Sequence, residues 1–240
     1  MTAPRPTVHF ADTGEAADLA AFLTRLLHYD KAAAVRVQAT GTTLAVFGRP
    51  ASFEVLAIRT ARLAKPYEHG LDAVLDLTAS AGELLERIDE GAGTALVPQP
   101  VTGPSWAGVL PPRGGWREVP GLPAPERIRA AVGAAVAEFR SRTEQLAPEE
   151  RTREALDRIG NDLWSRSLGE GGLPLRAAHA AHSLGFLRPA APGREPGLAL
   201  LATGPWLRLR TDYGSVAVRR SGSSAQLSVT PAQGRGRRAG

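Results

Sequence analysis

A segment of 25 residues, 99–123, interrupts the chain with six Pro and five Gly. Pro lacks the backbone N–H that a helix or a central strand uses, and Gly is conformationally permissive, so the segment predicts a break between two folded parts. It also contains Trp106 and Trp116. Because burial of a large apolar side chain stabilises a fold by roughly 1.5–3 kcal/mol, we expect the segment to pack on the folded parts as a connector.

Residues 1–98 predict an α+β domain with the element order β-α-β-β-β-β-α-β. Asp12 followed by Glu15 is a capping box that begins a one-faced helix. Segment 33–39 alternates apolar and polar residues, which is typical of a strand. Segment 53–63 fits a helix or a strand, and its alternation favours the strand. The expected strands are 7–10, 33–39, 44–47, 53–63, 71–78 and 94–97, and the expected helices are 12–28 and 80–88.

Residues 124–220 predict three helices followed by a three-stranded antiparallel meander, so the fold class of the whole chain is α+β. The helices are expected to begin at Pro125, Pro148 and Pro174, since Pro is favoured in the first turn of a helix. The meander spans 198–220, and a turn at 211–214 would place Leu209 opposite Val216, Leu207 opposite Val218 and Trp206 opposite Arg219. Residues 221–240, rich in Ser, Gly and Arg, are expected to form a disordered basic tail.

The positive charge of the chain is concentrated at its C-terminal end. The net charge is +5 and the isoelectric point is about 10.3, but residues 204–240 alone hold seven Arg and one Asp. A local cationic patch attracts phosphate backbones or acidic protein surfaces, whereas an evenly spread charge of this size would indicate little.

The C-terminal Arg residues therefore form the first candidate binding surface. Together with an aromatic side chain on the same predicted strand, they suit contact with nucleic acid without strong sequence preference. The same polar alternation is also typical of any half-exposed antiparallel sheet. The candidate residues are Arg208, Arg210, Arg219, Arg220 and Trp206, with Arg235, Arg237 and Arg238 in the tail.

The connector is the alternative candidate. Trp106 and Trp116 lie in a Pro/Gly-rich segment, and aromatic side chains are enriched at protein interfaces. The sequence therefore also allows a protein-interaction or self-assembly module that uses these two residues.

No catalytic or metal-binding pattern stands out. The chain has no Cys, which excludes thiolate ligands and thiol nucleophiles. His179 and His182 are spaced i, i+3, but a catalytic zinc site needs a third protein ligand. Ser105 lies between Gly103 and Gly108, whereas a nucleophile elbow needs Gly-x-Ser-x-Gly. We expect no metal, no cofactor and no catalytic residue. An enzyme would need a pocket that gathers Ser105 or His179 with a carboxylate.

The expected location is the cytoplasm, without a membrane partner. No apolar run reaches the roughly 20 residues that span a bilayer, and the first ten residues lack the apolar core of a signal peptide.

The order of elements in residues 7–90 resembles part of a domain of the bacterial DNA polymerase sliding clamp. The stretch 76–85 is similar to the strand-to-helix junction of that domain. The resemblance implies a fold pattern only. Clamp helices that line the ring are basic, whereas the helix expected from Ala81 carries Glu83 and Glu86, so no binding residue is transferred.

Overall fold

The computed structural model describes residues 6–64, 75–189, 193 and 197–220. This part of the chain is α+β, and its strands pair antiparallel in sheets of eight, three and two strands. The eight-stranded sheet has the order β5-β2-β3-β4-β13-β12-β11-β8, the three-stranded sheet β1-β7-β6, and the two-stranded sheet β10-β9.

The elements of the N-terminal half follow the predicted order, with one strand added. They are β1 (Thr7–His9), α1 (Thr13–Tyr29), β2 (Ala34–Thr40), β3 (Thr43–Gly48), β4 (Leu56–Arg62), β5 (Leu75–Ser80), α2 (Ala81–Glu86), β6 (Ile88–Asp89) and β7 (Thr94–Leu96).

Local capping sets the helix starts in this half. The Asp12 side chain accepts a hydrogen bond from the backbone N–H of Glu15, and Ser80 accepts one from Glu83, as predicted. The strand interpretation of 53–63 is confirmed for 56–62 by β4, whereas Phe53 and Glu54 lie in the turn before it, because Glu54 has the left-handed φ of +52°. The helix expected to reach Ile88 is shorter, because Ile88 pairs with Ala95 in β6 and β7. Residues 71–74 of the expected strand 71–78 lie outside the described residues.

The C-terminal half contains helices, 3-10 turns and strands. They are the 3-10 turn η2 (Ser105–Gly108), β8 (Arg117–Glu118), α3 (Pro125–Glu144), the 3-10 turn η3 (Pro148–Glu150), α4 (Arg153–Trp164), β9 (Ser167–Leu168), β10 (Leu173–Pro174), α5 (Leu175–Ser183), β11 (Ala199–Thr203), β12 (Trp206–Thr211) and β13 (Gly214–Arg219).

The predicted start of the second helix at Pro148 is wrong. Pro148 begins a single 3-10 turn, and α4 begins at Arg153. The reason is capping: the Thr152 side chain accepts from the backbone N–H of Ala155, while Ala147, which precedes Pro148, has no side-chain oxygen for this purpose.

A left-handed glycine ends α5. Gly185 has φ +75°, the left-handed conformation that Gly adopts without penalty. Its N–H donates to the His182 carbonyl at 3.0 Å, and the Phe186 N–H donates to the Ala181 carbonyl at 2.8 Å. These two bonds form a Schellman motif, and the buried Phe186 fixes the chain that leaves the helix.

The terminal meander joins the N-terminal strands in one sheet. Ser215 of β13 pairs with Ile58 of β4, which links the two groups of strands. The predicted register within the meander is confirmed, with Leu209 opposite Val216 and Trp206 opposite Arg219. Thr211 pairs with Gly214, so the connection between β12 and β13 is a two-residue turn and not a four-residue loop. The sequence placed these strands in separate units, and the domain boundaries themselves stay a prediction.

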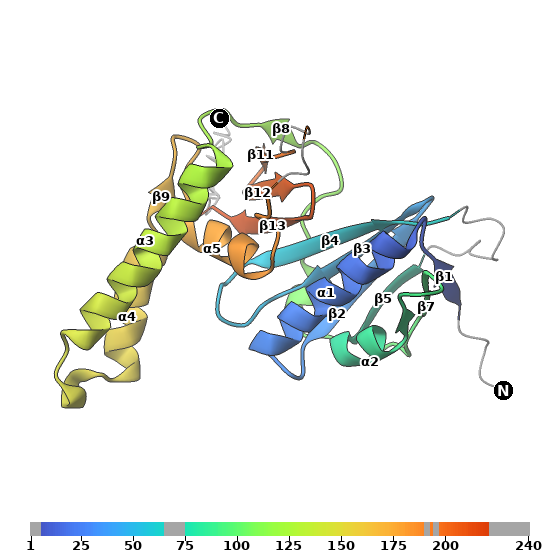
Figure 1. Cartoon of the computed structure of the whole chain (residues 1–240), viewed down its shortest axis with the longest axis horizontal. Helices are drawn as coiled ribbons and strands as arrows, with labels where there is room; N and C mark the ends of the chain where they lie inside the picture. The colour runs from blue at the N-terminus through green and yellow to red at the C-terminus, as the bar shows by residue number, and fades with distance from the viewer. Residues whose placement is uncertain (1–5, 65–74, 190–192, 194–196, 221–240) are drawn as a thin grey trace, which may run out of the picture.

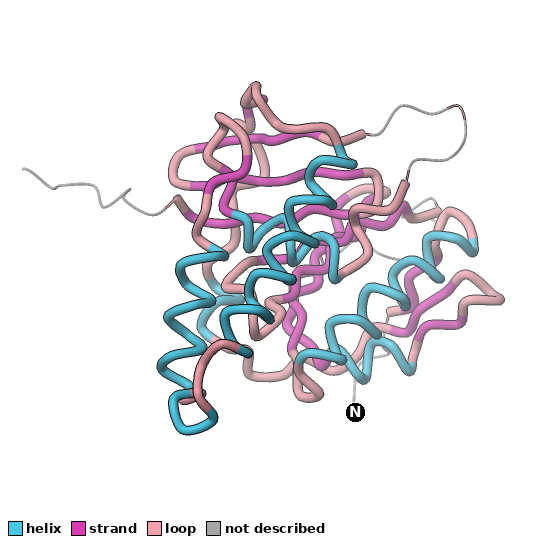
Figure 2. Tube along the Cα trace, turned by 60° about the vertical axis from the view of Figure 1, so that its left-hand side comes forward, coloured by secondary structure: helices cyan, strands magenta, loops and turns pink. Residues whose placement is uncertain are grey.

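α1 and α5 lie on one face of the large sheet (Figures 1 and 2). α1 contributes Phe22 and Leu26, which pack against the strands beside Gly48, where an added Cβ would lie 2.6 Å from Leu26. α5 packs on the same face at β13, next to Val216. This two-layer arrangement leaves the opposite face of the sheet, here called the open face, to the connector.

The connector crosses the open face. The Val101 N–H donates to the Thr78 carbonyl at 2.9 Å, which holds the connector on the edge strand β5. Trp106 then packs with Leu110 on a second apolar cluster formed by Phe47, Leu56, Ile58 and Ala217. Glu118 pairs with Leu201, so the connector ends as the last strand of the sheet.

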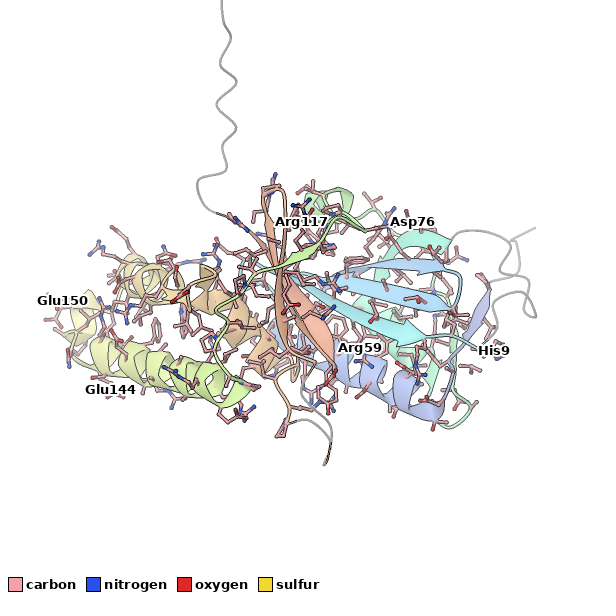
Figure 3. All side chains as sticks on the ribbon, turned by 90° about the horizontal axis from the view of Figure 1, so that it is seen from above. His9, Arg59, Asp76, Arg117, Glu144 and Glu150 are labelled. Atoms are coloured by element: carbon pink, nitrogen blue, oxygen red, sulfur yellow. The ribbon has the colours of Figure 1, made fainter. Side chains whose placement is uncertain are left out.

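α3 and α4 form a hairpin that extends away from the sheets (Figure 1). Glu144 and Glu150 lie at its far end, on the opposite side of the molecule from His9 (Figure 3). Arg166 joins the two helices through a bidentate pair with Glu138 at 2.7 and 2.9 Å. Among the described residues, no helix is both long and apolar enough to cross a membrane.

Candidate functional site

A groove of about 290 Å³ lies where β3 and β13 end and β4 and β12 begin. Two indole rings and three guanidinium groups line it. We call it the Trp/Arg groove, and it is formed by Arg49, Glu54, Trp106, Val109, Arg176, Trp206 and Arg219, with the adjacent ends of β4 and β13.

The two indoles come from different parts of the fold. Trp206 is the first residue of β12 and lies directly opposite Arg219, whose guanidinium carbon is 5.7 Å from the indole centroid. Trp106 lies in η2 of the connector, and one side of it packs on the apolar cluster of the open face. Both indoles are only half-buried, so each keeps an accessible surface beside the groove.

The three arginines of the groove have no direct ion-pair partner among the described residues. Arg49 follows β3, Arg176 lies in the first turn of α5, and Arg219 ends β13. Within the described ranges none of them forms an ion pair, and the Nε of Arg176 is buried without a hydrogen-bond partner. A bound anion would therefore displace no carboxylate from these groups.

Glu54 is the one carboxylate of the groove lining. It has φ +52°, and no other described residue except Gly has a positive φ. A left-handed conformation costs an L-residue about 1–2 kcal/mol, so the surrounding structure holds the backbone of Glu54 in place.

The other predicted arginines of the meander lie outside the groove. Arg208 is half-buried under Trp116, with its guanidinium carbon 5.7 Å from the indole centroid. Burial, and next the charge of Arg210, lower the pKa of Arg208. Arg210 is exposed on the same face, and Arg220 is exposed after β13. The tail residues Arg235, Arg237 and Arg238 lie outside the described residues.

The two connector tryptophans have different contacts. Trp106 lines the groove, whereas Trp116 covers Arg208 and donates from its Nε1 to the Pro112 carbonyl at 2.9 Å. The groove thus combines one residue of the interaction hypothesis, Trp106, with two residues of the nucleic-acid hypothesis, Trp206 and Arg219.

Sequence reasoning missed Arg49, Glu54 and Arg176. They occur at two distant places in the chain, Arg49 and Glu54 in the loop between β3 and β4 and Arg176 in α5, and each is locally an ordinary residue. Only the pairing of β4 with β13 and the packing of α5 on β13 bring them together.

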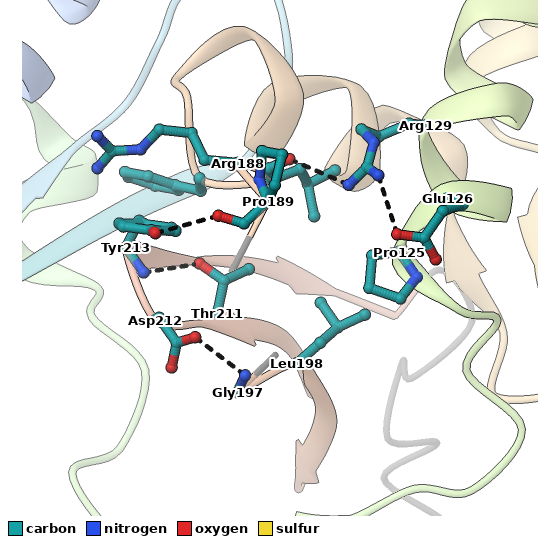
Figure 4. A pocket seen from close by; sticks show the side chains of 12 residues that line it. Pro125, Glu126, Arg129, Arg188, Pro189, Gly197, Leu198, Thr211, Asp212 and Tyr213 are labelled. Carbon is teal, nitrogen blue, oxygen red and sulfur yellow. Dashed lines mark hydrogen bonds and ion pairs between the residues drawn. The ribbon is translucent and has the colours of Figure 1, made fainter. Parts of the chain in front are cut away.

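The cavity beside the turn between β12 and β13 is a weaker candidate (Figure 4). Its volume is only about 80 Å³. The Tyr213 hydroxyl donates to the Pro189 carbonyl, Asp212 accepts from the Gly197 N–H, and Arg188 stacks 3.9 Å from the Tyr213 ring centroid. These groups already satisfy one another.

A wider cavity of about 410 Å³ lies at the start of α1. Three of its carboxylates are paired with arginines: Asp12 and Glu15 with Arg62, and Asp18 with Arg59. The fourth, Asp212, accepts a hydrogen bond from the Gly197 N–H. These carboxylates therefore already have partners.

The described residues contain no group of three or more His, Asp or Glu side chains placed to hold a metal ion. His179 instead stacks on Trp164 at 4.4 Å and meets the edge of Phe53 at 5.0 Å. Burial, and next the charge of His182, lower the pKa of His179.

Comparison with known families divides the chain within the connector. Residues 3–108 match a family model described as a domain of unknown function (DUF8010). Residues 111–223 match a second, also described as a domain of unknown function (DUF8185). No curated protein matches the chain.

Proposed function

We propose that this is a non-enzymatic, cytoplasmic protein that binds single-stranded nucleic acid without strong sequence preference. The binding surface consists of the Trp/Arg groove, the exposed Arg210 and Arg220, and the basic tail. The observation that carries the proposal is that three guanidinium groups, which form no ion pair with any described residue, surround two half-buried indoles.

The two kinds of side chain have separate tasks in this proposal. Arginines attract phosphates and release counterions, which makes the affinity depend on salt. Indoles stack on bases, which contributes about 1–3 kcal/mol per base and tolerates any sequence. Bases stacked inside a duplex cannot reach the indole faces, so the groove favours a single strand.

Fluorescence anisotropy with a labelled 20-nucleotide single strand of mixed sequence tests the proposal between about 50 and 200 mM salt. The triple variant Arg49→Ala, Arg176→Ala and Arg219→Ala should reduce the slope of log affinity against log salt by about 2, or about 0.7 for each phosphate contact. Trp206→Ala should weaken binding and leave that slope unchanged. Deletion of residues 221–240 should reduce the slope further.

The matched control is Arg140→Ala, which removes an exposed arginine of α3 that forms no ion pair with the described residues. It should leave both the affinity and the slope unchanged. An absence of binding at about 50 mM salt, or a slope that none of the groove variants and the tail deletion alters, contradicts the proposal.

The second candidate function is self-assembly through the connector. Its specific support is that Val101 and Val109 are 42% and 54% exposed, and Val109 adjoins Trp106 in the groove. Exposed apolar side chains beside an aromatic residue favour a protein contact.

Sedimentation velocity of the full chain tests this second candidate. If Val109→Asp abolishes self-assembly and the Arg triple variant leaves it intact, the result favours the self-assembly function over nucleic-acid binding. A monomer at all concentrations that the method covers would exclude self-assembly.

A further inference from the structure

The strained position of Glu54 places a carboxylate in a groove that otherwise attracts anions. Glu54 lies between two buried residues, Phe53 and Val55, which are 6% and 3% exposed. Phe53 meets the rings of Tyr29 at 5.1 Å and of His179 at 5.0 Å, edge to face in both cases. These contacts anchor the turn on both sides of Glu54 and maintain its left-handed backbone.

Gly would adopt this conformation without strain, so the presence of a side chain at position 54 costs stability. A negative charge beside Arg49, Arg176 and Arg219 also weakens the attraction for phosphate. The backbone strain does not stabilise the fold, and the negative charge does not help a site that binds phosphate alone. The side chain is explained if its carboxylate contacts something other than phosphate.

An ionised carboxylate only accepts hydrogen bonds. Cytosine offers an exocyclic amino group, a pairing that Glu and Asp make in known complexes. Thymine offers the O4 carbonyl at the same position, which a carboxylate repels, and its one donor, N3–H, lies between two carbonyl oxygens that repel a carboxylate as well. A base that stacks on Trp106 or Trp206 would present this edge to the other walls of the groove.

We propose that Glu54 gives the groove a preference for bases that carry an exocyclic amino group over thymine or uracil. This inference rests on the proposed function, because it needs a base in the groove. It makes Glu54 a specificity-determining residue and assigns the phosphate contacts to the three arginines.

The experiment compares 15-nucleotide oligomers of deoxycytidine and of deoxythymidine, two pyrimidines of similar size. Wild-type protein should bind the deoxycytidine oligomer roughly five- to tenfold more tightly. Glu54→Gln should bring this ratio close to one, chiefly by improving binding of the deoxythymidine oligomer. Glu54→Gly should also lose the preference and should raise the melting temperature, since it relieves the left-handed strain.

The matched control is Glu149→Gln, which removes an exposed carboxylate at the end of the helical hairpin. It should keep the wild-type ratio. If both oligomers bind and the ratio is the same in wild type and Glu54→Gln, the inference is overturned while nucleic-acid binding stands. If neither oligomer binds wild-type protein, nucleic-acid binding itself is refuted, and the inference with it.

Discussion

The arginines of the described residues fall into two groups according to what their guanidinium groups contact. Arg59 is buried and bonds Glu15, Asp18 and the Tyr213 carbonyl at 3.3, 3.1 and 2.7 Å. Such a group is structural, because removing one partner of a buried pair leaves an uncompensated charge. Arg49, Arg176 and Arg219 have no carboxylate partner within the described ranges and are free to bind an anion. The two groups differ in whether the guanidinium group is paired with a carboxylate, which the residue type alone does not reveal.

His179 leads to a prediction about pH. Its pKa is lowered from the ordinary value of 6.5 by burial and by His182. Below pH 6.5 the unfolded chain therefore binds a proton more readily than the folded one. The stability contributed by neutral His179 is complete above that pH and is lost as the pH falls toward the folded-state pKa.

Urea unfolding between pH 8 and 5 checks this prediction. His179→Phe, which keeps the ring contacts with Trp164 and Phe53, should show a smaller loss of stability on acidification than the wild type. His182→Asn, a change at an exposed residue of the same helix, should retain most of that loss. Equal pH dependence in the wild type and His179→Phe would show that His179 does not titrate in this range.

At the level of elements, features set by neighbouring residues could be predicted from the sequence. The caps Asp12 and Ser80, the left-handed Gly185 and the register of the meander all depend on short-range patterns. The strands β6, β9 and β10 could not be predicted in this way. Each has two residues and exists only because a partner strand lies beside it.

The same limit applies to the candidate site. Trp206 and Arg219 were found because they lie opposite each other on adjacent strands. Arg49, Glu54 and Arg176 were missed because they approach that pair only through tertiary packing. The similarity of residues 7–90 to a sliding-clamp domain concerns the order of elements and stays a prediction.

At the level of the whole molecule, the boundary between the two family matches does not coincide with a gap in the sheet. The first match ends at residue 108 and the second begins at residue 111, both inside the connector. The eight-stranded sheet nevertheless continues from one matched region into the other through β4 and β13. A single apolar core also contains Leu26 of α1 together with Leu209 of β12.

This continuity predicts that the chain unfolds in one cooperative transition, because separating the halves would expose the β4–β13 edge and divide the core. Three of the four tryptophans, at 116, 164 and 206, lie in the second family match. Trp106 lies in the first match and packs on N-terminal strands, so the test uses a Trp106→Phe background. In that background tryptophan fluorescence reports on the C-terminal half, while far-ultraviolet circular dichroism reports on both halves. The two signals should give the same urea midpoint and the same slope of unfolding free energy against urea concentration.

The variant Ala57→Pro sharpens this test. Ala57 is fully buried in β4 between Gly48 and Val216, and Pro there removes an N–H and disturbs the centre of the sheet. Although the change lies in the first family match, in the Trp106→Phe background it should lower the midpoint of tryptophan fluorescence, which then comes only from the second match. Fluorescence that unfolds at the wild-type midpoint, while circular dichroism shows an earlier transition, would mean that the two halves are independently stable and that the shared sheet couples them only weakly.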